Sequence, residues 1–86
     1  MPSNHELKIR AKALEPVIRI GKLGLNQGVI TEIKKQLHKK NLVKVKILKS
    51  ALGEQDKKEF AEEIAEKTNS ELIDFVGLIV VLNNKR

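Results

Sequence analysis

The first helical pattern lies near the N-terminus, where Leu7, Ala11 and Leu14 recur at helical spacing. Ser3 precedes this apolar stripe. Glu6 comes three residues after Ser3, which is the spacing of a helix capping box. The pattern therefore predicts a helix that begins after Ser3. A proline two residues beyond Leu14 is expected to end it, because the residue before a proline avoids helical backbone angles.

Two later segments predict further helices. The first begins after Asn26, a favoured N-cap residue, and runs to about Lys40, where Asn41 suits a left-handed C-terminal position. The second spans residues 54–67, which contain five glutamates. Apolar residues at helical spacing mark the buried faces: Ile30, Ile33 and Leu37 in the first, and Phe60, Ala61, Ile64 and Ala65 in the second.

Short β-branched or alternating runs predict four strands. They cover residues 17–20, 43–48, 72–76 and 78–82. Only Gly77 separates the last two runs, so their connection must be tight. The order is αβαβαββ, and we expect a single α/β domain over residues 1–86 in which helices pack on a mixed four-stranded sheet.

Charge adds the first functional information. Residues 1–49 carry 12 basic and 3 acidic side chains, whereas residues 50–86 carry 5 basic and 8 acidic ones. A one-sided positive field favours a polyanionic partner, most often nucleic acid. The alternative is a basic surface that serves only solubility. Cysteine is absent, which excludes disulfides, thiolate zinc sites and cysteine nucleophiles. The longest uncharged apolar run, residues 75–82, is too short to span a bilayer, so we expect a cytoplasmic protein that does not engage membranes.

A Gly-x-x-Gly sequence stands between the first predicted strand and the second predicted helix. Glycines allow a backbone to approach a phosphate closely, and amides at a helix N-terminus attract anions. A nearby arginine and the lysine inside the motif add full positive charges. The alternative is an ordinary strand-to-helix turn, since the bare motif is common. The predicted clamp consists of Arg19, Gly21, Lys22, Leu23 and Gly24.

Further lysines could extend this clamp. Lys8 and Lys12 lie on the first predicted helix, and Lys34 and Lys35 lie on the second. We expect all four to contact RNA if these two helices flank the loop. The alternative is a solvated helix surface, which is what most lysine runs form.

No constellation for catalysis, a metal or a cofactor is evident. His5 and His38 are on different elements, and neither has a second ligand at metal-binding spacing. The glutamates of residues 54–67 alternate with lysines as on a solvated face, and we expect this acidic helix to form the side that repels RNA. Phe60 and Phe75 are the only aromatic residues and fit the core, so base-stacking platforms are not expected.

Several runs of the chain resemble the CRM domain (chloroplast RNA splicing and ribosome maturation), and most closely its stand-alone YhbY-like members. These are residues 14–25, 28–30, 32–33 and 42–46. The resemblance extends from about Leu7 to Leu82. It implies a fold like the C-terminal domain of translation initiation factor three, RNA binding through the Gly-x-x-Gly loop, and association with pre-ribosomal large-subunit particles.

The predicted function is therefore that of a small, monomeric, non-catalytic RNA-binding protein in assembly of the large ribosomal subunit. One alternative is an Alba-like protein that coats DNA or RNA in chromatin. Such proteins use a long β-hairpin arm, for which the single Gly77 leaves almost no tip. Another alternative is an interaction adaptor that uses the acidic helix of residues 54–67.

Overall fold

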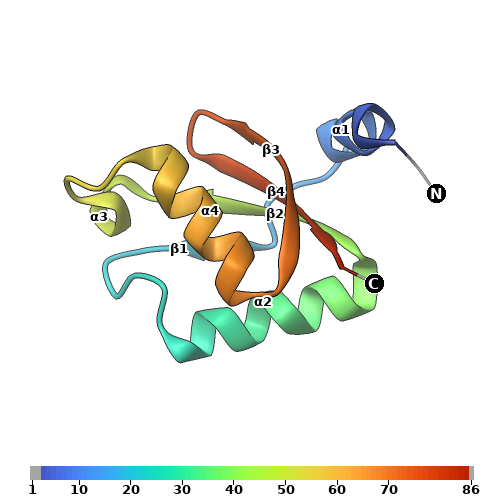
Figure 1. Ribbon diagram of the computed structural model, residues 1–86. Coiled ribbons are helices and arrows are strands. Elements are labelled where there is room, and N and C mark those ends of the chain that lie inside the picture. The colour runs from blue at the N-terminus through green and yellow to red at the C-terminus, as the bar shows by residue number, and fades with distance from the viewer. Residues whose placement is uncertain (1–2, 86) are drawn as a thin grey trace.

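Four strands form one mixed sheet in the computed structural model, which describes residues 3–85 (Figure 1). The strands are β1 (Ile18–Ile20), β2 (Leu42–Ile47), β3 (Ser70–Val76) and β4 (Ile79–Asn84). Their order across the sheet is β1-β2-β4-β3. β1 runs parallel to β2, whereas β4 is antiparallel to both of its neighbours. The predicted mixed four-stranded sheet is confirmed.

The helices lie on both sides of this sheet. They are α1 (Asn4–Lys12), α2 (Gln27–Lys40), α3 (Lys49–Leu52) and α4 (Lys57–Lys67). α2 and α4 cover one face, and α1 packs alone on the other face, beyond the sheet in the view of Figure 1. Two separate apolar clusters result.

The main cluster lies between the sheet and the pair α2 and α4. Alternate residues of β2 point into it, because successive side chains of a strand face opposite ways. Val43, Val45 and Ile47 are each 1% exposed or less. The smaller cluster lies under α1 and consists of Leu7, Ala11, Ile73 and Val81, with Leu42 packed against it.

Capping hydrogen bonds set the helix boundaries where the sequence predicts them. The Ser3 hydroxyl accepts a hydrogen bond from the Glu6 amide at 3.2 Å, and the Asn26 side chain accepts one from the Val29 amide at 2.9 Å. Asn41 ends α2 with a φ of 68°. These boundaries depend only on residues a few positions apart, so local sequence is sufficient to predict them.

Three details differ from the expectations. α1 ends at Lys12, so Leu14 lies beyond the helix and is 38% exposed. A short helix, α3, precedes α4, and half-buried residues attach it to the main core. α4 begins at Lys57 rather than near residue 54, because the Asp56 side chain caps it by accepting from the Glu59 amide at 3.1 Å.

β3 contains an irregularity that strict alternation does not predict. Leu72 stands opposite Leu82 and Asp74 stands opposite Val81, so Ile73 is the extra residue of a β-bulge. Ile73 joins the cluster under α1, whereas Phe75 packs against the main core. The bulge therefore turns Asp74 toward the α1 side of the sheet.

The hairpin between β3 and β4 is short. Only Gly77 and Leu78 separate the two strands, and Gly77 has a φ of 60° that favours glycine. The long β-hairpin arm of an Alba-like protein is therefore absent from residues 70–84.

Candidate nucleic-acid interface

The Gly-x-x-Gly sequence forms a closed turn between β1 and α2. The Gly24 amide donates to the Gly21 carbonyl at 2.8 Å. Gly24 has a φ of 69°, so its backbone conformation favours glycine. Gly21 has no such requirement, and a Cβ there would meet Leu48 Cδ1 at an ordinary 3.7 Å. The turn thus holds its shape through Gly24 and leaves bare backbone at Gly21.

The tip of this turn projects into solvent. Lys22 is exposed, and Leu23 is 84% exposed, which is an unusual position for a large apolar side chain. α2 begins three residues after Gly24, and its Val29 amide is already bonded to Asn26. The turn, rather than the first turn of the helix, is therefore the projecting part of this corner.

A second basic surface lies on the α1 side of the sheet. Pairing places Arg19 beside Lys46, and Lys46 beside Ile79. The neighbours of Arg19 and Lys46 along their strands face the main core, so these two side chains point the opposite way. We call the part of the sheet that α1 leaves uncovered the open face.

Basic residues continue from the turn across the open face to α1. We call this series the basic path, and it consists of Lys22, Arg19, Lys46, Lys44, Lys12 and Lys8. The turn lies beyond the end of β2, where the Leu48 amide donates to the Ile20 carbonyl, whereas α1 packs near Leu42 at the beginning of β2. At about 3.3 Å per residue, the path along β2 is roughly 20 Å long.

The side chains of the basic path form no ion pair among the described residues, although Asp74 lines a pocket together with Lys8, Lys12 and Lys44. Within residues 3–85, the ion pairs join Arg10 to Glu6 and Lys67 to Glu63, and neither involves the basic path. Lys44 has a structural partner, since its Nζ donates to the Leu14 carbonyl at 3.0 Å. That bond ties the linker between α1 and β1 to the sheet.

The structure does not bring all predicted site residues together. α1 and α2 pack on opposite faces of the sheet, so the condition for all four helix lysines to contact RNA, that both helices flank the loop, is not met. Lys8 and Lys12 lie on α1 at the border of the open face, whereas Lys34 and Lys35 are exposed on the other layer. RNA contact by the α2 lysines stays a prediction, and it would require RNA to bend around the turn.

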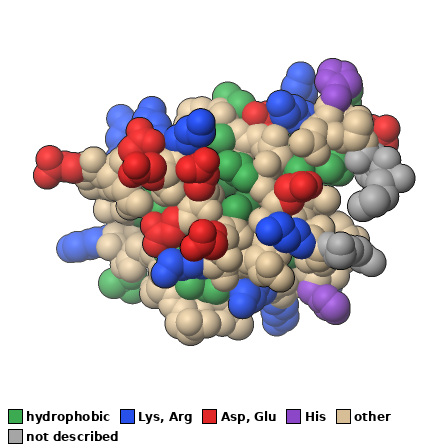
Figure 2. Space-filling model, viewed as in Figure 1, with side chains coloured by type: hydrophobic (Ala, Val, Ile, Leu, Met, Phe, Trp, Pro, Cys, Tyr) green, Lys and Arg blue, Asp and Glu red, His purple; other side chains and the backbone are tan. Residues whose placement is uncertain are grey.

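Acidic side chains concentrate on the layer opposite the open face. Figure 2 shows them gathered over α4, whose Glu59, Glu62 and Glu66 are exposed. A polyanion is repelled by such a surface and attracted by the basic path. The opposed charges therefore orient the molecule with its open face toward a polyanion.

A sequence model of the CRS1/YhbY (CRM) domain matches residues 3–83. The chain belongs to this family. It is 40% identical over 80 residues to a probable RNA-binding protein of Methanocaldococcus jannaschii, covering 93% of this chain and 59% of that protein. It is 33% identical over 76 residues to a probable RNA-binding protein of Bacillus subtilis, covering 88% of this chain and 77% of that one.

A solved structure confirms the α/β fold. The solution structure of a Staphylococcus aureus protein, itself proposed to bind RNA, is 32% identical with a TM-score of 0.79. The match covers 96% of this chain and 84% of that one.

Other kinds of site are not found in the described part of this CRM protein. Among residues 3–85, no group of three or more His, Cys, Asp or Glu side chains is placed to hold a metal ion, and His5 and His38 are both exposed. No helix within the same range is long and apolar enough to cross a membrane.

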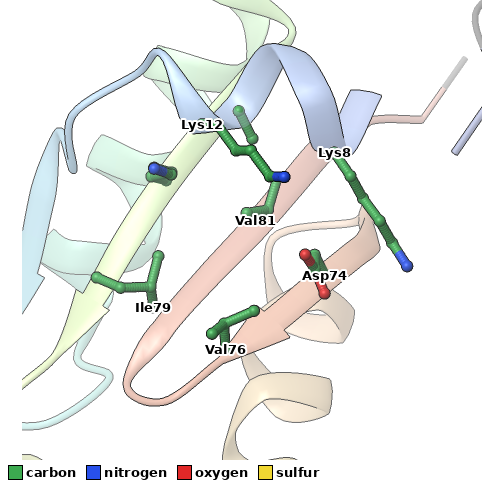
Figure 3. Close-up of a pocket in the computed structure, with 8 residues that line it drawn as sticks. Lys8, Lys12, Asp74, Val76, Ile79 and Val81 are labelled. Carbon is green, nitrogen blue, oxygen red and sulfur yellow. The ribbon is translucent and has the colours of Figure 1, made fainter. Parts of the chain in front are cut away.

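One feature at the border of the open face was not predicted from the sequence. A pocket of about 280 Å³ lies between α1 and the sheet (Figure 3). Its lining includes Asp74, Val76 and Ile79, none of which was predicted as a site residue. The bulge in β3 brings Asp74 there, and the sequence signal for it is a carboxylate within the apolar run of residues 72–76.

Proposed function

We propose that this CRM protein is a non-catalytic RNA-binding protein that grips the RNA backbone with the Gly21–Gly24 turn and the basic path. One observation carries the proposal: a projecting turn with an exposed Lys22 stands at the end of a row of basic side chains that have no acidic partners among residues 3–85. Lysine and arginine contacts to phosphate fix the position of a nucleic acid without reading its sequence.

Two observations favour RNA over DNA as the ligand. The M. jannaschii and B. subtilis relatives are named as probable RNA-binding proteins. The short hairpin at Gly77 and Leu78 lacks the arm with which an Alba-like protein would hold duplex DNA. Tight binding of duplex DNA at the same salt concentration as RNA would argue against this choice.

Replacing Arg19 and Lys22 by alanine is expected to reduce the salt dependence of RNA binding. Each neutralised phosphate of a single strand contributes about 0.7 to the slope of log K against log salt, so the double variant should lose roughly 1.4. Fluorescence anisotropy with a single-stranded RNA over a salt series measures the slope. A variant with Lys57 and Lys58 replaced by alanine removes the same charge from α4 and should keep the slope. An unchanged slope in the Arg19/Lys22 variant would exclude both side chains from the interface.

The finer proposal is that the bound RNA belongs to precursors of the large ribosomal subunit, with the protein acting as a cytoplasmic monomer. Crosslinking in cells, followed by sequencing of the bound RNA, tests it. We expect reads concentrated on large-subunit ribosomal RNA, and co-sedimentation with large-subunit precursors in sucrose gradients. Reads spread evenly over transcripts would indicate a general RNA coat instead.

A further inference from the structure

We propose that the pocket between α1 and the sheet holds one unpaired guanine base of the bound RNA. This inference rests on the proposed function, because it assigns a base-reading site next to a surface that grips phosphates. The pocket has an apolar floor, one carboxylate and a rim of lysines. These residues are Ala11, Val76, Ile79 and Val81 on the floor, Asp74, and Lys8, Lys12 and Lys44 on the rim (Figure 3).

The size of the pocket suits a single base. Its volume of about 280 Å³ lies just below the roughly 300–1,000 Å³ of pockets that hold drug-sized ligands. Unpaired bases in RNA are commonly splayed out and laid against a flat side-chain surface. Phe60 and Phe75 are directed to the main core, so an aliphatic surface takes this role. Val76, which is 66% exposed, and Ile79 form the side of the pocket that a base would cover.

Asp74 gives the pocket its chemical preference. The bulge at Ile73 turns its carboxylate toward the pocket, and bulges commonly re-aim a side chain in this way. Asp74 Oδ1 accepts a hydrogen bond from the Phe75 amide at 2.9 Å. Within residues 3–85, no ion pair engages Asp74, although three lysines line the same pocket. The carboxylate retains capacity to accept hydrogen bonds from a ligand.

Guanine matches this arrangement better than the other bases. Its Watson–Crick edge presents the N1 and N2 donors side by side, and a carboxylate can accept both. Adenine and cytosine place an acceptor nitrogen beside a single amino group, and uracil flanks its one N–H with two carbonyl oxygens that a carboxylate would repel. The rim lysines can donate to guanine O6 or N7, which are common partners of basic side chains. Neighbouring phosphates would lie along the basic path.

The test compares two RNA oligonucleotides of equal length, an oligouridine and the same strand with one central guanosine. Wild-type protein should bind the guanosine strand roughly five-fold or more tightly, which is the lower end of base discrimination by a good bidentate contact. Asp74→Asn should remove this ratio. Because the ratio is measured within one variant, a change in general RNA affinity cancels. Glu71→Gln makes the same charge change on β3 outside the pocket and should keep the ratio.

A change in the ligand tests the same contact without altering the protein. Inosine lacks the 2-amino group, so placing it at the central position should remove most of the preference. Equal binding of the two strands by wild-type protein, or an unchanged ratio in Asp74→Asn, would overturn the guanine pocket and leave RNA binding intact. Failure to bind either strand would overturn the proposed function itself. Free GMP should compete only at much higher concentrations than the oligonucleotide. If it competed at equally low concentrations, the occupant would be a free nucleotide and not a base of an RNA strand.

Discussion

Replacing both Gly21 and Gly24 by aspartate is expected to abolish RNA binding while the domain remains folded. The two carboxylates would stand on either side of Lys22, at the turn that we propose to meet phosphates. Like charges brought together in an interface cost several kcal/mol, which corresponds to a loss of affinity of about 100-fold or more. Anisotropy with single-stranded RNA measures the loss, and circular dichroism with thermal unfolding reports the fold.

The structure allows both substitutions without a steric clash. A Cβ at Gly21 stays 3.7 Å from Leu48 Cδ1, and one at Gly24 meets nothing within 4 Å. The left-handed backbone at Gly24 disfavours aspartate by about 1 kcal/mol. A matched control replaces Gly53 and Asn69, which also have positive φ, by aspartate. It adds the same charge outside the turn, and circular dichroism reports whether this control also remains folded. Equal loss of binding in the control, or retained binding in the turn variant, would refute the clamp.

Local signals were sufficient to predict the four strands and α1, α2 and α4, but not the short helix α3. The Ser3 and Asn26 caps each bond an amide three residues along the chain, so the sequence itself contains both partners. The alternation from Val43 to Ile47 predicts a strand with one buried face, and the structure buries that face almost completely. Such features depend on short-range geometry and need no knowledge of the rest of the molecule.

The assignment of helices to layers was not predictable in the same way. An apolar stripe shows which side of a helix is buried, but not which face of a sheet it covers. α1 and α2 both have such stripes and lie on opposite faces. This difference separates Lys8 and Lys12 from Lys34 and Lys35, and it decides which lysines can act together.

The bulge in β3 is the other feature that was not predicted from the sequence. Simple alternation places Asp74 on the same face as Leu72, which packs against the main core. A buried unpaired carboxylate is unfavourable, so an extra residue that turns Asp74 outward relieves a conflict between pattern and packing. The position of Asp74 thus follows from the tertiary structure.

The uneven distribution of charge along the chain does not by itself show on which surfaces the basic and acidic residues lie, because the fold decides this. The basic path takes all of its residues from the first half and lies along the turn, the open face and α1, whereas the acidic residues of α4 lie on the opposite layer (Figure 2). Because α2 joins α4 on that layer, its lysines lie close to the acidic surface. The steering of RNA toward the open face that we propose therefore depends on the placement of α1 and β1 more than on net charge.

Truncation of Phe60 to alanine is expected to have the largest effect on stability. Phe60 is 3% exposed and lies in the main cluster, on the side of α4 that faces the sheet. Removing a buried phenyl ring costs about 3–5 kcal/mol. Domains of this length have a free energy of unfolding of roughly 4–13 kcal/mol, so a large fraction of it should disappear. Urea unfolding followed by circular dichroism measures the difference.

Leu23→Ala provides the matched control, because it also truncates a large apolar side chain but at a position that is 84% exposed. Its free energy of unfolding should stay within about 0.5 kcal/mol of wild type. RNA binding should weaken in this variant at full stability, since Leu23 lies at the tip of the proposed clamp. A comparable loss of stability in Leu23→Ala would mean that this side chain packs against the protein in solution. The turn would then be a structural element, and the proposed contact with RNA would have to lie elsewhere on the basic path.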